Sequence, residues 1–450
     1  MFTKSASHNI NYLASIVNID TFRPHVNADR LKVANIYGNV VITGIAAQEG
    51  LFCYFPLECS ISPEFLSYTN AFRDKDLNRD KSIASMFETH GRVRAIRLRG
   101  EKSEGYIVPV DTLVDFVNNF LGKSISKDDI KAGDDFDTVH GHQICQKYIP
   151  RGVRQANNGV SKKTKGNIKR YVSRLVENQF HFHQDTSHLK RQVANISPED
   201  YISITDKLHG ANFIVSHVLV KKQLSWKEKI AKWFGVSVQD TEYGMLYSSR
   251  AVIKNANVNL DKNPNHFYGE DIWKIVADKA FPCLREGISI VGEVVGFTPA
   301  GGYIQKSYDY GCDSGQLDFY VFKMTYTSAS GDVYVFSHRE MVDYCAKFGL
   351  KTPRTFFHGK AKDVFPEIPV DENWHDAFLQ SMITHYLEKK CDLCKNDVWA
   401  EGVVLRKETP HEWDAYKLKS FNFLGYESAQ LDTGEVDIET QEAENTVEEE

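Results

Sequence analysis

A lysine and a glycine stand three residues apart in the segment Asp-Lys-Leu-His-Gly at 206–210. A lysine amine attacks an electrophile only after losing its proton, so a nucleophilic Lys207 needs desolvated or cationic surroundings. Gly210 has no Cβ, which allows a tight turn and a close approach of the backbone to a bound ligand. Taken alone the spacing is a weak signal, because a surface lysine before a turn has the same pattern.

Three further side chains suited to chemistry follow in order. Arg250 ends a strand-like run, Glu293 lies near the end of an apolar run, and Phe322 ends an aromatic-rich run. A carboxylate inside an apolar run is half buried, which is costly unless it has a partner. An aromatic ring can stack on the face of a purine. The ordered set strengthens the interpretation of Lys207 as a nucleophile.

The last segment joins a carboxylate to two lysines. Glu401 begins a short apolar run, and after a turn the chain continues as Ala-Tyr-Lys-Leu-Lys at 415–419. Residues two apart in a strand face the same way, so Lys417 and Lys419 project together. Two ammonium groups on one face suit a phosphate.

These motifs resemble those of the covalent nucleotidyltransferase superfamily of ligases and capping enzymes. They are K-L-H-G at 207–210, S-S-R at 248–250, V-G-E at 291–293, F-Y-V-F at 319–322, E-G-V-V at 401–404 and K-L-K at 417–419. The string K-L-H-G-A-N-F is most similar to the nick-sealing RNA ligases typified by the second phage RNA ligase. Ligases that act on DNA usually have Asp where His209 stands. The resemblance covers about residues 180–425 and indicates an ATP-dependent RNA ligase.

The resemblance implies a role for each matching residue. Lys207 would take AMP from ATP, Phe322 would stack on the adenine, and Lys417 and Lys419 would grip the α-phosphate. Mg²⁺ or Mn²⁺ would act with Glu401 and Glu293. The implied catalytic residues are Lys207, Glu401, Lys417 and Lys419. The implied nucleotide-binding residues are Lys207, His209, Gly210, Asn212, Arg250, Glu293, Phe322, Glu401, Lys417 and Lys419. We expect the nucleotide site to lie wholly after residue 180.

The chain departs from the family pattern at two places. Lys323 follows Phe322 where many relatives have Asp, so any role of that Asp is absent or moved. The interval between Lys207 and Arg250 is longer than the family pattern leads us to expect. The extra segment at 221–240 has apolar residues at helical spacing, and it is either a surface helix or a lid over the RNA.

The N-terminal string P-H-V-N-A-D-R-L-K-V at 24–33 resembles the strand entry of tRNA-binding OB domains attached to synthetases. Short strand-like runs separated by turns over about 100 residues predict a small barrel. A basic stretch follows at 146–174 and is either a solvated charge run or a contact to phosphates. The RNA-binding candidates in the two segments are Arg92, Arg94, Arg97, Arg99, Lys162, Lys163 and Lys165.

We predict an α+β fold in which an adenylyltransferase domain, built on antiparallel, ATP-grasp-like sheets, follows a small all-β OB-type barrel. The predicted parts are an OB-type domain at 1–120, a basic and partly helical linker at 121–178, a catalytic domain at 179–430 and an acidic disordered tail at 431–450. The predicted strands include 32–37, 39–43, 50–55, 92–98, 106–110, 201–205, 288–291, 317–322, 332–336 and 402–405. The predicted helices are 226–234, 265–281, 339–348 and 374–388.

Composition indicates the charge distribution, the cellular location and the state of the cysteines. The net charge is −6, but the last twenty residues hold nine acidic residues and no Lys or Arg, which leaves +3 for the rest. No apolar run spans a membrane and the N-terminus lacks a signal sequence, so we expect a cytoplasmic protein. We also expect a monomer. The eight cysteines are expected to be reduced thiols, and the Cys391/Cys394 pair is weak evidence for zinc.

The predicted function is the ATP-dependent joining of RNA 3′-OH and 5′-phosphate ends through a Lys207–AMP intermediate and an RNA-adenylate. The partner would be a nicked or broken structured RNA. A DNA ligase or a GTP-dependent capping guanylyltransferase would share the lysine chemistry and is the first alternative. A non-catalytic RNA-binding protein is the second.

Overall fold

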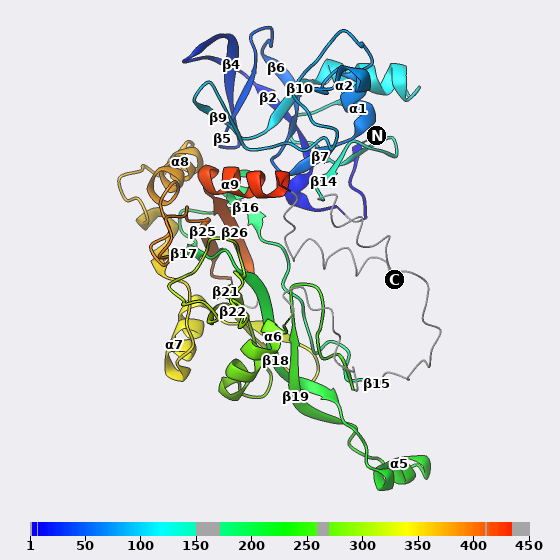
Figure 1. Ribbon diagram of the computed structural model, residues 1–450, viewed down its shortest axis with the longest axis vertical. Helices are drawn as coiled ribbons and strands as arrows, with labels where there is room; N and C mark the ends of the chain where they lie inside the picture. Colours follow the sequence, from blue (N-terminus) through cyan, green and yellow to red (C-terminus); the bar gives the residue numbers. More distant parts are fainter. Residues whose placement is uncertain (1, 7, 150–171, 259–269, 410–411, 434–450) are drawn as a thin grey trace.

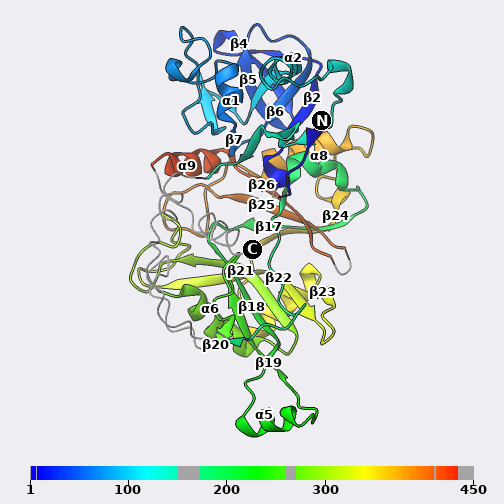
Figure 2. The same ribbon diagram turned by 90° about the vertical axis from the view of Figure 1, so that its right-hand side faces the viewer.

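The computed structural model describes residues 2–6, 8–149, 172–258, 270–409 and 412–433. Figure 1 shows an elongated molecule with a β-rich N-terminal part at one end, two sheets with helices in the middle, and a thin arm at the other end. Figure 2 gives the same order of parts after a quarter turn. Among the described residues, no helix has both the length and the apolar character needed to cross a membrane.

The N-terminal part consists of short strands and two helices. The strands are β1 (Phe2–Thr3), β2 (Ala14–Ile19), β3 (Arg23–His25), β4 (Ala28–Ile36), β5 (Asn39–Gly44), β6 (Gly50–Phe55), β7 (Cys59–Ile61), β8 (Ile96–Leu98), β9 (Glu101–Ser103), β10 (Tyr106–Pro109), β11 (Asp135–Phe136), β12 (Thr138–Val139), β13 (His142–Gln143) and β14 (Cys145–Lys147). The helices are α1 (Pro63–Tyr68) and α2 (Val110–Asp115), and shorter helical turns are η1 (Ile10–Tyr12), η2 (Lys75–Leu77), η3 (Phe116–Phe120) and η4 (Lys127–Asp129).

Strand pairing in this part gives several small antiparallel sheets. The largest has the order β10-β6-β2-β11, and a second has the order β3-β4-β5. The pairings of the described strands close no barrel. One apolar core joins α1 and α2 to the first of these sheets and includes residues as far along the chain as Cys145.

The turn between β4 and β5 also touches the middle of the molecule. Tyr37 and Gly38 both have positive φ, at 51° and 70°, as a two-residue hairpin of this twist requires. A Cβ at Gly38 would lie 2.9 Å from a methyl carbon of Leu379 in α8 (Trp374–Tyr386), so a larger residue would require that side chain to move.

The middle of the molecule contains two five-stranded sheets. Their orders are β16-β26-β25-β17-β24 and β19-β18-β21-β22-β23, and every pairing is antiparallel except that of β16 with β26. The strands are β16 (Ser187–His188), β17 (Tyr201–Lys207), β18 (Ala211–Lys221), β19 (Thr241–Ser248), β21 (Ile288–Gly296), β22 (Leu317–Thr327), β23 (Val333–Val335), β24 (Thr355–Lys360), β25 (Gly402–Lys407) and β26 (Asp414–Lys419). A separate pair joins β15 (Val172–Ser173) to β20 (Asn257–Val258).

Helices cover these sheets through two apolar cores. Helices α6 (Ile272–Ala280) and α7 (His338–Phe348) pack on the second sheet through residues such as Trp273 and Met341. Helix α8 packs on the first sheet through Trp374 and Phe378. The remaining helices of the described residues are α4 (Leu189–Gln192), α5 (Trp226–Trp233), α9 (Phe421–Asp432), η5 (Val193–Asn195), η6 (Phe281–Cys283) and η7 (Ala361–Asp363).

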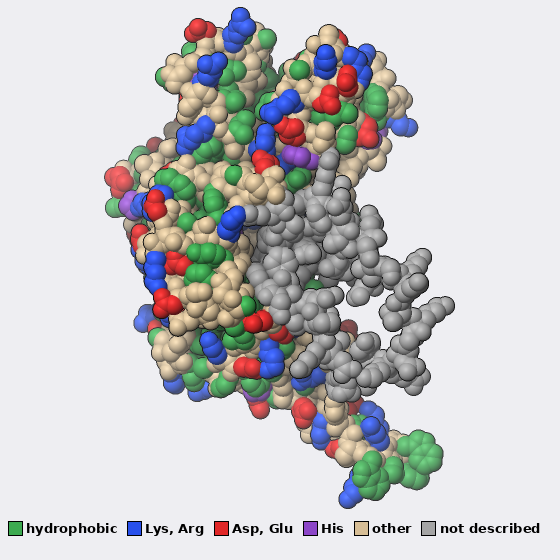
Figure 3. Space-filling model, in the orientation of Figure 1, with side chains coloured by type: hydrophobic (Ala, Val, Ile, Leu, Met, Phe, Trp, Pro, Cys, Tyr) green, Lys and Arg blue, Asp and Glu red, His purple; other side chains and the backbone are tan. Residues whose placement is uncertain are grey.

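Strands β18 and β19 continue past their sheet and form an arm that ends in α5 (Figure 1). Ser225 caps α5 reciprocally with Glu228, which stabilises this short helix. Three aromatic side chains of α5 and its end are well exposed: Trp226 at 68%, Trp233 at 80% and Phe234 at 70%. They form the apolar cluster at the tip of the arm in Figure 3.

The N-terminal part is fixed to the middle by ion pairs that are largely hidden from solvent. Lys190 of α4 lies 2.8 Å from Glu104, and the two side chains are only 10% and 1% exposed. Arg191 lies 2.7 Å from Asp135. Buried charges are tolerated only when they are paired and hydrogen-bonded, so these contacts specify how the two parts dock.

The predicted mixture of helices with several antiparallel sheets is confirmed. Most predicted elements lie within a few residues of observed ones, but the strand predicted at 92–98 is shorter. Only β8 forms there, in a hairpin with β9, while Arg92 makes an isolated bridge to Ser60. The predicted helix in the linker, the start of the helix predicted from residue 265, and residues 434–450 of the predicted tail lie outside the described residues.

Candidate active site

One cavity of about 300 Å³ collects all the nucleotide-binding residues expected from the sequence. They are Lys207, His209, Gly210, Asn212, Arg250, Glu293, Phe322, Glu401, Lys417 and Lys419. The two middle sheets supply these residues from strands that are far apart in the chain. A cavity of this size with a few convergent polar groups is the usual form of a small-molecule site.

The centre of the cavity is an ion-pair cluster built by three neighbouring strands. Lys207 pairs in register with Gly402, which pairs with Lys419, so Glu401 lies beside both lysines. Glu401 Oε1 lies 2.8 Å from Lys207 Nζ and 3.0 Å from Lys419 Nζ. Burial alone would raise the pKa of Glu401, but the two lysines outweigh it and lower that pKa to about 2. The cluster therefore holds one carboxylate between two ammonium groups.

The turn after Lys207 explains the glycine of the motif. A Cβ at Gly210 would lie 2.4 Å from the carbonyl oxygen of Val294, so only glycine allows β18 to pack against β21. The backbone N–H of His209 donates to the Tyr310 hydroxyl at 2.6 Å. The His209 ring lies edge-on to Phe423 at 4.9 Å. Burial lowers the pKa of His209 although Glu401 opposes this, which favours the neutral imidazole.

The two lysines of β26 differ in their surroundings. Burial and the charges of Lys419 and Lys207 lower the pKa of Lys417 well below its usual range. Burial also disfavours the charged form of Lys419, but Glu427 and Glu401 outweigh it and raise that pKa. Among the described residues, no carboxylate forms an ion pair with Lys417 as Glu401 and Glu427 do with Lys419. An anion entering the cavity would therefore stabilise the charge of Lys417.

An aromatic group forms another part of the cavity. The Phe322 ring lies 5.2 Å from His183 and 6.2 Å from Trp413 between ring centroids. Burial lowers the pKa of His183 well below its usual range, and Lys323 adds to this effect. Lys323 itself lies over the Trp413 ring at 5.2 Å. The lysine that stands where many relatives have Asp thus packs against an aromatic wall.

Polar residues stand next to this group. Arg250 forms an ion pair with Asp185. Asn212 is 5% exposed and donates from Nδ2 to the Gly292 carbonyl at 3.4 Å. Its register partner is Glu293 on β21, which places the two side chains side by side at the cavity.

A divalent cation fits the donor set. Glu401 is 3% exposed, and its Oε2 makes no hydrogen bond. A buried carboxylate oxygen without a donor can accept a cation or a water molecule held by one. Among the described residues, no three His, Cys, Asp or Glu side chains are grouped to hold an ion by themselves. Mg²⁺ is commonly bound by one or two carboxylates, waters and substrate phosphates, which matches this arrangement.

The N-terminal part also lines the cavity. Asn11, Tyr12, Glu58 and Tyr148 all border it, so the prediction of a site wholly after residue 180 is wrong. Burial raises the pKa of Tyr12 to about 12. The prediction failed because these residues have no motif around them, and only the docking of the two parts brings them to the site.

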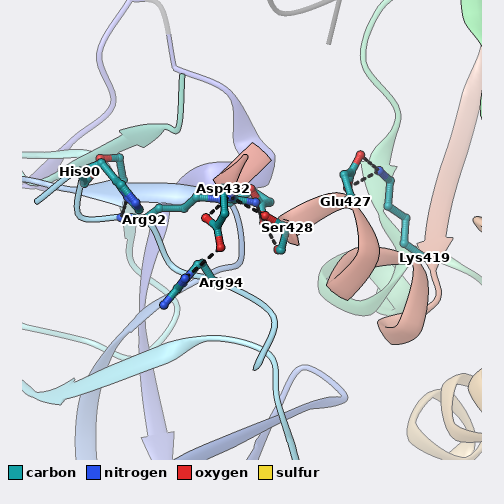
Figure 4. A network of polar contacts seen from close by, with 9 residues as sticks. His90, Arg92, Arg94, Lys419, Glu427, Ser428 and Asp432 are labelled. Atoms are coloured by element: carbon teal, nitrogen blue, oxygen red, sulfur yellow. Dashed lines mark hydrogen bonds and ion pairs between the residues drawn. The ribbon is translucent and has the colours of Figure 1, made fainter. Parts of the chain in front are cut away.

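The arginines predicted to bind RNA have different positions. Arg92 has a buried side chain that pairs with Glu58 at 2.7 Å and with Asp432 at 3.2 Å. Arg94 also pairs with Asp432, at 2.9 Å (Figure 4). Arg97 donates to Asn422 at 3.0 Å, and Arg99 is exposed. The candidates Lys162, Lys163 and Lys165 lie outside the described residues.

Residues 200–420 match the model of the RNA ligase family. They form an RNA ligase domain. This domain contains every predicted nucleotide-binding residue from Lys207 to Lys419. The prediction of an enzyme of the RNA ligase family within the covalent nucleotidyltransferase superfamily is confirmed. No curated protein matches the chain.

The fold is similar to that of RNA ligase from Naegleria gruberi over nearly the whole length of both chains. A mutant of that ligase with ATP and Mn is 13% identical, with a TM-score of 0.52 over 94% of this chain and 99% of that one. The same ligase with PPi is 15% identical, with a TM-score of 0.52 over 93% and 99%. Another mutant, with AMP and Mn, is 14% identical, with a TM-score of 0.53 over 92% and 98%. The match therefore extends beyond the RNA ligase domain to the N-terminal part.

Sequence reasoning missed residues that the RNA ligase domain receives through tertiary contacts. Trp413 borders Phe322, and Glu427 reaches Lys419 from α9. The only sequence signal for Glu427 is its position eight residues after Lys419, which is two helical turns. Trp413 stands just before β26 and carries no spacing that marks it as part of a site.

Proposed function

We propose that this protein is an ATP-dependent RNA ligase that joins a 3′-OH to a 5′-phosphate through a lysine adenylate and an RNA-adenylate. The observation that carries the proposal is the 2.8 Å contact between Lys207 and the buried Glu401, with Lys419 on the same carboxylate oxygen. The similar Naegleria structures contain ATP, AMP and Mn, which supports ATP and a divalent cation as ligands here.

In the first step Lys207 Nζ attacks the α-phosphorus of ATP. A nitrogen–phosphorus bond forms, the bond to the β-phosphate oxygen breaks, and pyrophosphate leaves. The attacking amine must be neutral, so the Lys207 ammonium must first release a proton to water. Glu401 faces this ammonium at 2.8 Å and stabilises its charge, and a divalent cation on that carboxylate would weaken this effect and favour the neutral amine. Lys417 and Lys419 project from the same face of β26 and would offset the charge on the α-phosphate. Such preorganised charge supplies much of the rate in phosphoryl transfer.

Glu401 and Glu293, which both line the cavity, would hold the divalent cation together with the phosphates. The cation supplies charge neutralisation of the phosphates when bound. Phe322 would stack on the adenine, and His183 and Trp413 would enclose the base. Arg250, Asn212 and Glu293 would position the ribose.

In the second step the AMP passes to the 5′-phosphate of the RNA, and Lys207 regains its free amine. In the third step the 3′-OH attacks that phosphate and AMP leaves. His209 would support these steps as a neutral donor or acceptor beside Glu401, 4.0 Å away. The phosphate-binding lysines would serve each step in turn, because each transfers a phosphoryl group.

We also propose that the N-terminal part is an OB-type domain that helps to bind RNA and precedes a catalytic domain at 179–430. Strands β11–β14 and their core residues belong to this part, so it extends beyond the predicted boundary at residue 120 into the predicted linker at 121–178. The P-H-V-N-A-D-R-L-K-V string and the exposed Arg99 support this proposal. Its substrate would be a nicked or broken structured RNA. The protein would act as a cytoplasmic monomer. Of the acidic tail predicted at 431–450, Leu431 and Asp432 belong to α9, and residues 434–450 lie outside the described residues.

Label transfer tests the proposal. The purified chain is incubated with ATP or GTP labelled at the α-phosphate, with Mg²⁺, Mn²⁺ or a chelator, and then denatured. We expect a covalent label from ATP that depends on the cation and is released as AMP by acid, as a phosphoramidate would be. Preferential labelling by GTP would favour a capping enzyme. Nicked RNA and nicked DNA are then compared as substrates, and preference for DNA would favour the DNA ligase alternative.

A further inference from the structure

Helix α9 begins immediately after the phosphate-binding strand β26. Ser420 caps it by accepting from the N–H of Phe423 at 3.4 Å. Glu388 accepts from the backbone N–H of Phe421 at 2.7 Å and from that of Asn422 at 3.1 Å. The first turn of the helix is therefore held firmly in place next to Lys419.

Two turns further on, Glu427 points back to Lys419. Both carboxylate oxygens of Glu427 lie 3.4 Å from Lys419 Nζ, as Figure 4 shows. Lys419 is 16% exposed and Glu427 is 26% exposed, so water screens the pair only in part. Lys419 thus stands between two carboxylates, Glu401 in the cavity and Glu427 on the helix.

The second carboxylate changes what Lys419 can do. Glu401 Oε1 already accepts from both Lys207 and Lys419. Without Glu427, the carboxylate that attracts Lys419 would be Glu401, whose Oε1 also faces Lys207. With Glu427 in place, the ammonium is held from two sides in one position. A lysine is flexible and loses much rotamer freedom when it is fixed, so such fixing is not expected from one ion pair alone.

The far side of α9 is anchored to the N-terminal part. Ser428, the next residue after Glu427, donates from its hydroxyl to Glu58 at 3.0 Å, and its carbonyl accepts from Arg92 at 3.2 Å. Asp432 at the end of the helix pairs with Arg92 and Arg94. Figure 1 shows α9 lying between the N-terminal part and the strands β25 and β26. The helix therefore has fixed contacts on both faces.

We propose that Glu427 is a positioning residue for adenylation: it holds the ammonium of Lys419 where the α-phosphate must lie, and α9 fixes Glu427 against the N-terminal part. This inference rests on the proposed function, because it needs a phosphate in the cavity. It assigns to the N-terminal part a contribution to the first chemical step, in addition to any binding of RNA.

The test is a double-mutant cycle on covalent labelling by ATP. The variants are Glu427→Gln, Lys419→Met and the pair together, with Glu427→Asp as the conservative change. Asp278→Asn is the matched control, since it removes one carboxylate from an exposed pair with Lys274 on α6. Single-turnover labelling is measured at saturating ATP and across ATP concentrations. Melting curves accompany every variant.

We expect Glu427→Gln to slow labelling at saturating ATP by about tenfold, the size of one lost charged hydrogen bond. The half-saturating ATP concentration should change far less, because the defect lies in orientation. Glu427→Asp should recover part of the rate, and Asp278→Asn should match the wild type. In the Lys419→Met background, Glu427→Gln should cost nothing further, because a residue that acts only through Lys419 has no effect in its absence.

The outcomes separate this inference from the proposed function. A wild-type chain that takes no label from ATP would remove the proposed function. A wild-type chain that labels, with Glu427→Gln equally fast, would overturn the positioning role alone. A double variant that labels more slowly than Lys419→Met would also overturn it. This conclusion holds even if Glu427→Gln has a lower melting temperature, because a general loss of stability slows labelling in either background.

Discussion

The cavity has two walls of different origin. The RNA ligase domain supplies one wall, in which Lys207, Glu401 and Lys419 come together through the ladder of β17, β25 and β26. The N-terminal part supplies the other, with Asn11, Tyr12 and Glu58. The first wall is made by adjacent strands whose motifs are visible in the sequence. The second exists only because buried ion pairs dock two separately folded parts.

The difference suggests a division of labour. The wall from the RNA ligase domain carries the nucleophile and the phosphate-binding cations. The N-terminal wall carries groups whose ionisation is altered by burial: burial raises the pKa of Glu58, although Arg92 opposes it. We infer that the first wall performs the chemistry and the second limits the freedom of the groups that do so. The following predictions test this from the largest expected effect to the smallest.

Removal of the nucleophile should have the largest effect. Lys207→Ala should abolish covalent labelling by ATP. The other amine on Glu401 Oε1, that of Lys419, is also paired with Glu427, and the two carboxylates raise its pKa and keep it charged. The side chain is 21% exposed and contributes little packing, so the melting temperature should stay close to that of the wild type. Normal labelling in this variant would move the nucleophile to another residue. The exposed Lys279→Ala on α6 serves as the control.

The phosphate-binding lysines should follow. Lys417→Ala or Lys419→Ala should slow labelling by about 100-fold, the scale of losing one preorganised charge. Burial and the neighbouring lysines lower the pKa of Lys417. Lys417→Arg therefore tests whether the charge or the shape of this side chain matters more, because a guanidinium is always charged but should fit the site poorly. Single-turnover labelling rates near normal for both alanine variants would contradict the assignment of Lys417 and Lys419 as phosphate-binding residues.

Loss of an ion pair that docks the N-terminal part should lower the free energy of unfolding. Glu104→Ala leaves the buried ammonium of Lys190 without its carboxylate, which should cost roughly 3 kcal/mol in free energy of unfolding. Urea unfolding followed by circular dichroism measures this cost. We expect slower labelling as well, because the N-terminal wall would lie less firmly on the cavity. A destabilised variant with an unchanged labelling rate would confine the second wall to a structural role.

The exposed arginine of the N-terminal part should affect RNA more than ATP. Arg99→Ala should weaken the sealing of nicked RNA a few-fold and flatten its salt dependence by roughly one counterion, if Arg99 contacts a phosphate. Covalent labelling should be unchanged. Arg92→Ala should behave differently and lower the melting temperature, since its guanidinium is buried between Glu58 and Asp432. If the two variants had the same effects on RNA sealing and on melting temperature, Arg99 could not be assigned to RNA binding and Arg92 to docking.

How far the sequence could predict this structure depends on the range of the contacts. Lys417 and Lys419 share a strand face by local geometry, and Gly210 is required by a close backbone contact, so both could be predicted. The dense arginines at 92–99 look like an RNA-binding edge. Nothing local reveals that Arg92 turns inward to α9, more than three hundred residues later in the chain. Glu427 and Tyr12 could not be found because their partners are set by docking, not by spacing.

The smallest effect on chemistry is expected at the tip of the arm, which contrasts with both walls. Trp233→Ser and Phe234→Ser remove large side chains that are 80% and 70% exposed, so little packing is lost. Strand β18 pairs with both neighbours near the cavity, which isolates Lys207 from changes at α5. Labelling and melting temperature should therefore match the wild type.

Sealing of nicked RNA then decides between the two interpretations of the arm. A surface helix leaves sealing unchanged, whereas a lid over the RNA predicts slower sealing with normal labelling. Slower labelling would contradict both, because it would require the arm to act on Lys207 along β18 and through the turn at 208–210, which joins β18 to the other sheet.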